Sequence, residues 1–304
     1  MSDAAASGVL LLAGPTGSGK SELAVRLALR YGAEIVGADS RQIYRGMPIG
    51  TALPPPDQLA AVAHHCVAFL DPQERYSAAR FALDAMAAID QIRARGKRAI
   101  VAGGTGFYLR ALAGGVELAP AYDERLRERL AREAAAHTTS FLHEWLAVRD
   151  PSRAAHLHPG DRYRVLRALE VALGAPAGRE RPLRTLAGAG IAQATIVIDL
   201  PLEELDARIE HRTDGMLAGG LVDEAERVGA GAVAATAVGY PQALAYLRGW
   251  ATRAELRASL LRATRRYARR QRAWFRSERD AVWLAPEAVD AAVREKLGWS
   301  ANDG

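Results

Sequence analysis

The sequence predicts an α/β fold: a P-loop NTPase-like parallel sheet flanked by helices, with a helical insertion domain. Short apolar segments that read as buried strands alternate with segments of helical periodicity, which is typical of a parallel sheet. A glycine-rich loop directly follows the first apolar segment, and residues 120–180 carry helical patterns rich in Arg, Glu and Ala. We therefore expect a core formed by residues 1–116 and 181–304, and an insertion over residues 117–180.

The glycine-rich loop is GPTGSGKS, and it lies between an apolar strand pattern (GVLLLAG, 8–14) and a helical pattern that opens at residue 22. Its spacing is G-x-x-x-x-G-K-S, in which glycines let backbone N–H groups converge on an anion at a helix N-terminus. Lys20 is expected to reach phosphate oxygens, and the Ser21 hydroxyl to help hold Mg²⁺. The loop predicts a polyphosphate ligand bound by Gly14, Pro15, Thr16, Gly17, Ser18, Gly19, Lys20 and Ser21.

Two further apolar segments, GAEIVGADS (32–40) and KRAIVAGGTG (97–106), predict the next strands of the sheet. A strand-like piece, HHCVAFLD, and a helix over 77–96 with Ser77 as N-cap lie between them. The carboxyl ends of parallel strands meet at one edge of a sheet. We therefore expect the glycine-rich loop, Asp39–Gln42 and Gly103–Gly106 to face one site.

The chain after the insertion returns to strand character in ATIVIDLP (194–201), and helical patterns then run to the end. Two aspartates at strand ends are candidates for the metal side of a phosphate site. For Asp199 a helix N-cap is the favoured interpretation over a metal ligand. Asp39 is expected to bind metal or accept a proton near the phosphates, with a loop cap beside Ser40 as the alternative.

The composition is that of a globular protein and excludes several classes. The 304 residues are 49% hydrophobic and 25% charged, with no signal pattern and no apolar run of membrane-spanning length, so we expect a cytoplasmic protein. The single cysteine, Cys66, excludes an internal disulfide and a cysteine-based zinc cluster. The net charge of +5 is too small to identify a partner by itself.

Arginines are concentrated in residues 262–279, where they alternate with aromatic side chains. At helical spacing they can share one face, which is the electrostatic footprint of a nucleic-acid-binding protein; a solvated surface helix is the alternative. That face would contain Arg262, Arg265, Arg266, Arg269 and Arg276, and the insertion repeats the pattern with Arg162, Arg164 and Arg167. Arg208 and Arg212 are one turn apart, so they either reach the phosphate site or pair with Glu210 and Asp214.

Taken together, these segments resemble one family, the tRNA dimethylallyltransferases or tRNA isopentenyltransferases. The resemblance covers nearly the whole chain in the family's order, through GPTGSGKSELA, DSRQIYRGMPIGTALP, DP-x₃-YSAARF, VAGGTGFYLRAL, HPGDRYRVLRALE, RIEHR and RRQRAWFR. It implies transfer of a dimethylallyl group from dimethylallyl diphosphate to N6 of the adenine immediately 3′ of the anticodon in tRNA, with Mg²⁺ as cofactor. One departure is that Thr236 and Pro241 flank AVGY where family members often carry basic residues.

The resemblance also assigns roles to residues. Asp39 would be the general base and Arg212 a contact to the diphosphate, so that the expected catalytic residues are Asp39, Lys20, Thr105 and Arg212. The residues expected to contact tRNA are Asp39, Ser40, Arg41, Gln42, Thr105, Arg127, Tyr163, Arg164, Val165, Leu166 and Arg167. Apolar and aromatic residues near Tyr44 and Phe107 would shelter the allylic group from water.

Two other functions share some of these features. A small-molecule P-loop kinase would have the same sheet and loop, but would not need a helix rich in arginine and aromatic residues. A nucleotide-switched RNA-binding module would explain the arginines but not Asp39 beside the phosphate loop. We expect a monomer that does not bind membranes.

Overall fold

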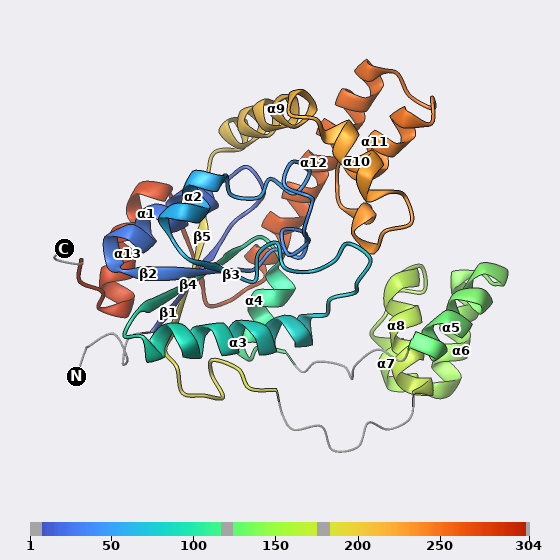
Figure 1. Ribbon diagram of the computed structural model, residues 1–304. Helices are drawn as coiled ribbons and strands as arrows, with labels where there is room; N and C mark the ends of the chain where they lie inside the picture. The colour runs from blue at the N-terminus through green and yellow to red at the C-terminus, as the bar shows by residue number, and fades with distance from the viewer. Residues whose placement is uncertain (1–7, 117–123, 175–182, 302–304) are drawn as a thin grey trace. The chain divides into compact units, whose positions relative to one another are not determined.

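The computed structural model describes residues 8–116, 124–174 and 183–301. These form a parallel sheet of six strands in the order β3-β2-β4-β1-β5-β6, with helices on both faces (Figure 1). The predicted parallel α/β fold is thus confirmed. The strands are β1 (Val9–Ala13), β2 (Ala33–Gly37), β3 (His64–His65), β4 (Arg98–Gly103), β5 (Gln193–Ile198) and β6 (Ala281–Leu284).

Two of the strand expectations need correction. The strand-like piece HHCVAFLD forms only the two-residue β3, after which an isolated bridge joins Tyr44 to Leu70. The helical patterns predicted to run to the end of the chain are interrupted by β6, which pairs in parallel with β5 at the edge of the sheet. Its four residues, AVWL, are too few to show a period, and only residues 277–280 separate them from the long helix α12 (Arg253–Arg276).

Two of the helices around the sheet begin at residues whose side chains cap the helix N-terminus. Ser77 caps α3 as predicted, its hydroxyl accepting a hydrogen bond from the Arg80 N–H. Thr252 and Glu255 form a capping box at the start of α12. The helices of this part are α1 (Lys20–Tyr31), α2 (Pro56–Ala61), α3 (Ala78–Ala94), α4 (Gly106–Ala113), α9 (Leu202–Ala218), α10 (Leu221–Val228), α11 (Tyr240–Leu247), α12 (Arg253–Arg276) and α13 (Val289–Leu297).

Buried side chains from both faces of the sheet hold these layers together. The β1 residues Leu10 and Leu12 pack in one core cluster with Leu27 of α1 and Val293 of α13. Figure 1 shows α3 running along the opposite face of the sheet. A second cluster joins α10, α11 and α12 to the loop after β2 through Met47, and it is this cluster that walls the site described below.

The chain divides into two compact units, residues 1–116 with 183–304, and residues 117–182. The second unit consists of α5 (Glu124–Ala136), α6 (Thr139–Arg149), α7 (Pro151–Ala155) and α8 (Arg162–Leu173) around a leucine-rich core of its own. Thr138, Asp150 and Asp161 cap α6, α7 and α8 with their side chains. The expected limit of the insertion at residue 180 lies outside the described residues, as does the N-terminal segment 1–7.

No helix in the described part of the chain is both long and apolar enough to cross a membrane.

Candidate active site

A cavity of about 220 Å³ lies at the carboxyl ends of the strands, between the glycine-rich loop and helices α9 and α12. It therefore occupies the position where ligands bind in open parallel sheets. The lining combines loop residues, the segment after β2 and side chains from the C-terminal helices: Thr16, Lys20, Ser21, Asp39, Ser40, Arg41, Gln42, Gly50, Thr51, Arg212, Met216, Thr236, Ala237, Val238, Leu260, Thr264, Tyr267 and Arg270.

The glycine-rich loop has the backbone conformation that its composition predicts. Gly17 and Gly19 have φ angles of 85° and 79°, which are rarely adopted by residues with a Cβ. The helix α1 begins at Lys20, immediately after Gly19, and Thr16, Lys20 and Ser21 are the loop residues that line the cavity. Ser18 is buried, and its hydroxyl has no hydrogen-bond partner among the described residues.

Two partly buried cationic side chains line the cavity. Desolvation and the nearby Arg212 lower the pKa of Lys20 to about 8, against the opposing attraction of Asp39. Burial also lowers the pKa of Arg212, and Asp39 again opposes the shift. The Arg212 Nη2 donates to the Thr51 carbonyl at 3.5 Å. Two partly buried cations close to one carboxylate leave an excess of positive charge, which suits a polyanionic ligand.

The two arginines of RIEHR, Arg208 and Arg212, are expected from the sequence either to reach the phosphate site or to pair with Glu210 and Asp214. Arg212 lines the cavity, whereas Arg208 pairs with Glu204 on the same helix at 2.7 Å. Neither pairs with Glu210 or Asp214, which contact α12 instead.

Asp39 and its neighbours form a short hydrogen-bonded segment on the other side of the cavity. The Asp39 Oδ1 accepts from the Arg41 N–H at 2.9 Å, so the loop-cap interpretation and the cavity position both hold. The Thr105 Oγ1 accepts from the Ser40 N–H at 3.0 Å and donates to the Ser40 Oγ at 3.3 Å. Thr105 is not among the residues that line the cavity; it fixes the segment that carries Asp39.

The apolar part of the cavity differs from the expectation. Neither Tyr44 nor Phe107 lines it: Tyr44 is buried and donates to the Glu74 carbonyl, and Phe107 packs edge-on against Trp274. The apolar lining instead comes from Met216, Ala237, Val238 and Leu260. These residues lie far from the glycine-rich loop in sequence. Ala237 and Val238 belong to the AVGY segment, whereas Met216 and Leu260 belong to no short motif named above.

Gln271 is a residue that the sequence reasoning missed. Its side chain is buried in α12, where Oε1 accepts from the Thr16 N–H at 2.8 Å and Nε2 donates to the Gly104 carbonyl at 2.8 Å. One side chain thus joins the glycine-rich loop to the turn after β4. It lies within an arginine-rich run, and its partners are 255 and 167 residues away, so spacing gives no signal for it.

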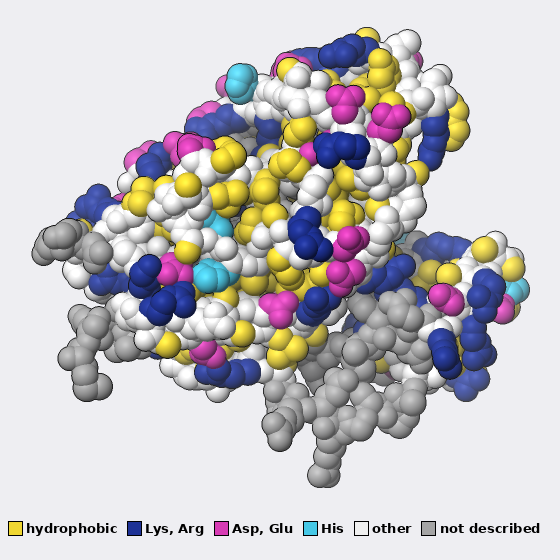
Figure 2. Space-filling model, viewed as in Figure 1, with side chains coloured by type: hydrophobic (Ala, Val, Ile, Leu, Met, Phe, Trp, Pro, Cys, Tyr) yellow, Lys and Arg dark blue, Asp and Glu magenta, His cyan; other side chains and the backbone are white. Residues whose placement is uncertain are grey.

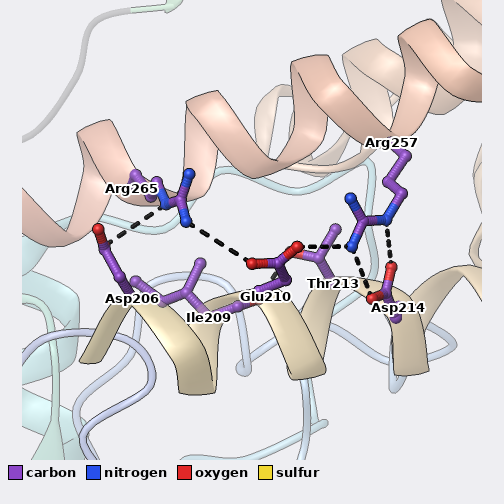
Figure 3. Close-up of polar contacts among 7 residues, drawn as sticks. All are labelled: Asp206, Ile209, Glu210, Thr213, Asp214, Arg257 and Arg265. Atoms are coloured by element: carbon purple, nitrogen blue, oxygen red, sulfur yellow. Dashed lines mark hydrogen bonds and ion pairs between the residues drawn. The ribbon is translucent and has the colours of Figure 1, made fainter. Parts of the chain in front are cut away.

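The arginines of α12 are divided between the cavity and the neighbouring helix α9. Arg270 lines the cavity. Figure 3 shows Arg265 between Asp206 and Glu210 of α9, and Arg257 between Glu210 and Asp214. Part of the arginine-rich helix is therefore neutralised within the protein, and on the face drawn in Figure 2 Asp and Glu side chains lie among the Lys and Arg.

Asp199 does not cap a helix, contrary to the expectation. Helix α9 begins at Leu202 with Pro201 as N-cap, and no side-chain cap is present. The Asp199 carboxylate instead pairs with Arg272 of α12 at 3.1 Å. This pair leaves Asp39 as the strand-end aspartate that lines the cavity.

The insertion residues with an expected tRNA role all lie on α5 and α8. Tyr163 is two-thirds exposed, and Arg164 and Arg167 pair with Asp161 and Glu170 of the same helix at 2.7 Å each. Val165 is fully buried in the core of the unit, so its side chain cannot reach an RNA. Leu166 packs against the same core, and Arg127 lies on α5.

The donor set at the cavity fits Mg²⁺. The Ser21 hydroxyl and the Asp39 carboxylate both line it, and both are hard oxygen donors of the type that Mg²⁺ takes along with waters and phosphate oxygens. The described residues contain no group of three or more His, Cys, Asp or Glu side chains able to hold a metal by themselves. A metal here would depend on a phosphate ligand for much of its coordination.

Comparison with known proteins agrees with this architecture. The IPP transferase family model matches residues 42–278, and the isopentenyl transferase model matches residues 7–72. The chain is 47% identical to a tRNA dimethylallyltransferase of Anaeromyxobacter dehalogenans, over 95% of this chain and 98% of that one. It is 41% identical to the tRNA dimethylallyltransferase of Geobacter sulfurreducens, over 91% of each.

Solved structures give the same result. The full-length tRNA isopentenylpyrophosphate transferase of Bacillus halodurans is 32% identical, with a TM-score of 0.70 over 96% of this chain and 97% of that chain. A eukaryotic dimethylallyltransferase acting on tRNA is 25% identical, with a TM-score of 0.76 over 94% of this chain and 77% of that chain.

Proposed function

The chain belongs to the IPP transferase family, and from this premise we propose that its cavity transfers a dimethylallyl group from dimethylallyl diphosphate to N6 of the adenine 3′ of the anticodon in tRNA. The products are N6-(dimethylallyl)adenosine and diphosphate. The relatives are tRNA prenyltransferases rather than kinases, so the kinase alternative is not supported.

The observation that carries the proposal is the division of the cavity into a charged side and an apolar side. Lys20 and Arg212 are partly buried cations that line the cavity, whereas Met216, Val238 and Leu260 form an apolar lining. A diphosphate that carries a five-carbon hydrocarbon needs both surfaces in one cavity. A nucleotide kinase would need a pocket for a polar base where the apolar lining stands.

The charged side would stabilise the leaving group. As the bond between the allylic carbon and the diphosphate oxygen breaks, negative charge grows on the diphosphate, and Lys20, Arg212 and the loop N–H groups are already oriented toward it. Mg²⁺, when bound at Ser21 and the phosphates, would supply further neutralisation of this charge. Because Lys20 and Arg212 are desolvated before the ligand arrives, their attraction for the leaving group is stronger than it would be in water.

Asp39 would accept the proton of the attacking amine. The N6 nitrogen of adenine forms a bond to the allylic carbon and loses one proton, for which Asp39 is the cavity carboxylate at a strand end. The adenine must leave its stack to enter the cavity. Ser40, Arg41 and Gln42 follow Asp39 along the cavity and are proposed to contact the extruded nucleotide.

The second unit is proposed to hold the anticodon stem through its exposed arginines, since phosphate contacts fix the register of an RNA without reading its sequence. As expected from the sequence, a monomer is proposed as the acting form. A tRNA substrate also agrees with the expected cytoplasmic location.

Incubation with dimethylallyl diphosphate, Mg²⁺ and an anticodon stem-loop, followed by nucleoside mass spectrometry, tests the function. We expect one adenosine to gain a C₅H₈ unit, and a stem-loop with guanine at that position to remain unmodified. Turnover of ATP without any prenylated nucleoside would refute the proposal.

A further inference from the structure

We propose that Glu224 and Tyr240 are positioning residues that hold the loop Met47–Ala52 against the cavity and thereby orient Arg212 and Gln42. The inference deepens the proposed function and rests on it. Neither residue lines the cavity. Tyr240 is the last residue of the AVGY segment, whereas Glu224 belongs to none of the segments named above.

Glu224 is a fully buried carboxylate that accepts hydrogen bonds from three donors. From α10 it accepts the backbone N–H groups of Ile49 at 2.9 Å and Gly50 at 2.7 Å. The Tyr240 hydroxyl donates to the same carboxylate at 2.7 Å. Glu224 and Tyr240 are both 0% exposed. A carboxylate is retained in such a place only when its hydrogen bonds are made, because an unpaired buried charge is very unfavourable.

Tyr240 also fixes the loop by direct packing. A Cβ added to Gly50 would lie 2.6 Å from the Tyr240 ring, so the ring rests on the Gly50 backbone with no room for a side chain. Burial, together with the hydrogen bond to Glu224, raises the pKa of Tyr240 and keeps its hydroxyl a donor. Glu224 therefore fixes the N–H groups of Ile49 and Gly50, and the Tyr240 ring fixes the backbone of Gly50.

The carbonyl groups of this loop accept hydrogen bonds from two side chains that line the cavity. The Thr51 carbonyl accepts from Gln42 Nε2 at 3.2 Å and from Arg212 Nη2 at 3.5 Å, and the Ala52 carbonyl accepts from Gln42 Nε2 at 2.8 Å. Ala52 has a φ angle of 46°, a left-handed conformation that is unfavourable for alanine and persists only where surrounding contacts hold it. Gln42 and Arg212 line the cavity on the expected tRNA side and diphosphate side, respectively.

Glu224→Gln keeps the size of the side chain but presents an amide N–H₂ to one of three donors, so the loop should shift. We expect kcat/KM for dimethylallyl diphosphate to fall by roughly tenfold to a hundredfold, since small misplacements at a reaction centre have effects of this size. A rise in KM should account for much of the fall, because Arg212 is the contact to the diphosphate. Tyr240→Phe keeps the ring on Gly50 and removes one donor, and should give a smaller change in the same direction.

Glu34→Gln is the matched control, because Glu34 is a buried carboxylate near the amino end of β2, away from the cavity. It accepts from Arg95 at 2.6 Å, His65 at 2.7 Å and Lys97 at 2.9 Å. This variant should lower the unfolding temperature and leave KM unchanged, because loss of folded protein lowers kcat alone.

The variants are compared by steady-state kinetics at saturating stem-loop RNA, with active sites counted by single turnover. A KM for Glu224→Gln and Tyr240→Phe equal to that of the parent would overturn the positioning role. If Glu224→Gln does not fold, Tyr240→Phe decides alone. Failure of the proposed function is distinct, since the parent itself would then give no prenylated RNA.

Discussion

The cavity at the strand ends and the helical unit of α5–α8 use charged side chains in opposite ways. In the cavity two cations are partly buried, and desolvation lowers the pKa of both Lys20 and Arg212. In the helical unit, Arg164 is largely exposed and is paired with the acidic residue that caps its own helix. Buried charges act strongly on a bound group, whereas exposed charges are screened by salt. The comparison predicts chemistry in the cavity and RNA affinity in the helical unit.

The largest effect should come from Asp39→Ala. If its carboxylate accepts the N6 proton, the chemical step should slow by roughly 10²–10⁴, the usual contribution of a positioned general base. Binding of both substrates should change far less, because we propose that Lys20, Ser21 and the loop N–H groups hold the phosphates. Single-turnover rates at several Mg²⁺ concentrations provide the measurement. Rescue by raised Mg²⁺ would instead make Asp39 a metal ligand.

Lys20→Ala should be next in size. Removing one preorganised partner of a developing charge typically lowers the rate by about 10²–10³. The deficit should appear in the rate of the prenylation step while the affinity for stem-loop RNA stays at the parent value. Filter binding of labelled RNA supplies that second measurement. An equal loss of RNA affinity would show that the cavity and the RNA surface are not separable.

The sequence predicted the cavity better on its loop side than on its helix side. The phosphate loop and Asp39 belong to contiguous segments whose spacing carries their geometry. Gln271 and Glu224 act through partners far away in the chain: Glu224 accepts hydrogen bonds from residues 174 and 175 positions earlier. Only tertiary packing brings such groups together, so no local pattern indicates them.

The same limit explains two of the wrong predictions, those for β6 and Asp199. β6 has four residues and no period, and only its pairing with β5 identifies it as a strand. Asp199 precedes a proline as an N-cap residue could, but Arg272 of α12 takes its carboxylate. The arginine-rich character of α12 was evident from sequence, whereas its partial neutralisation by α9 required the structure.

Replacing Arg127, Arg164 and Arg167 with alanine tests the helical unit. We expect RNA affinity to fall by at least about tenfold near physiological salt, and the slope of log affinity against log salt to flatten by about 0.9 for each phosphate that an arginine no longer neutralises. Affinity for dimethylallyl diphosphate should not change. The matched control replaces three exposed, paired arginines of the other unit, Arg30, Arg184 and Arg294, and so removes the same charge. An equal fall in RNA affinity in both triple variants would mean that the helical unit has no special part in RNA binding.

The smallest expected effect is a pH dependence that only a buried charge can produce. With a pKa of about 8, Lys20 loses its proton between pH 7 and pH 9, so affinity of the RNA-free protein for dimethylallyl diphosphate should fall by about tenfold over that interval. Stability of the unliganded protein should move the other way. The unfolded chain keeps the Lys20 proton up to about 10.5, so folding is favoured as pH rises from 8 to 10.5. Lys20→Met should abolish both trends, which calorimetric titration and thermal unfolding measure. If the fall in affinity persists in Lys20→Met, another group titrates in this range, and the lowered pKa of Lys20 is not its cause.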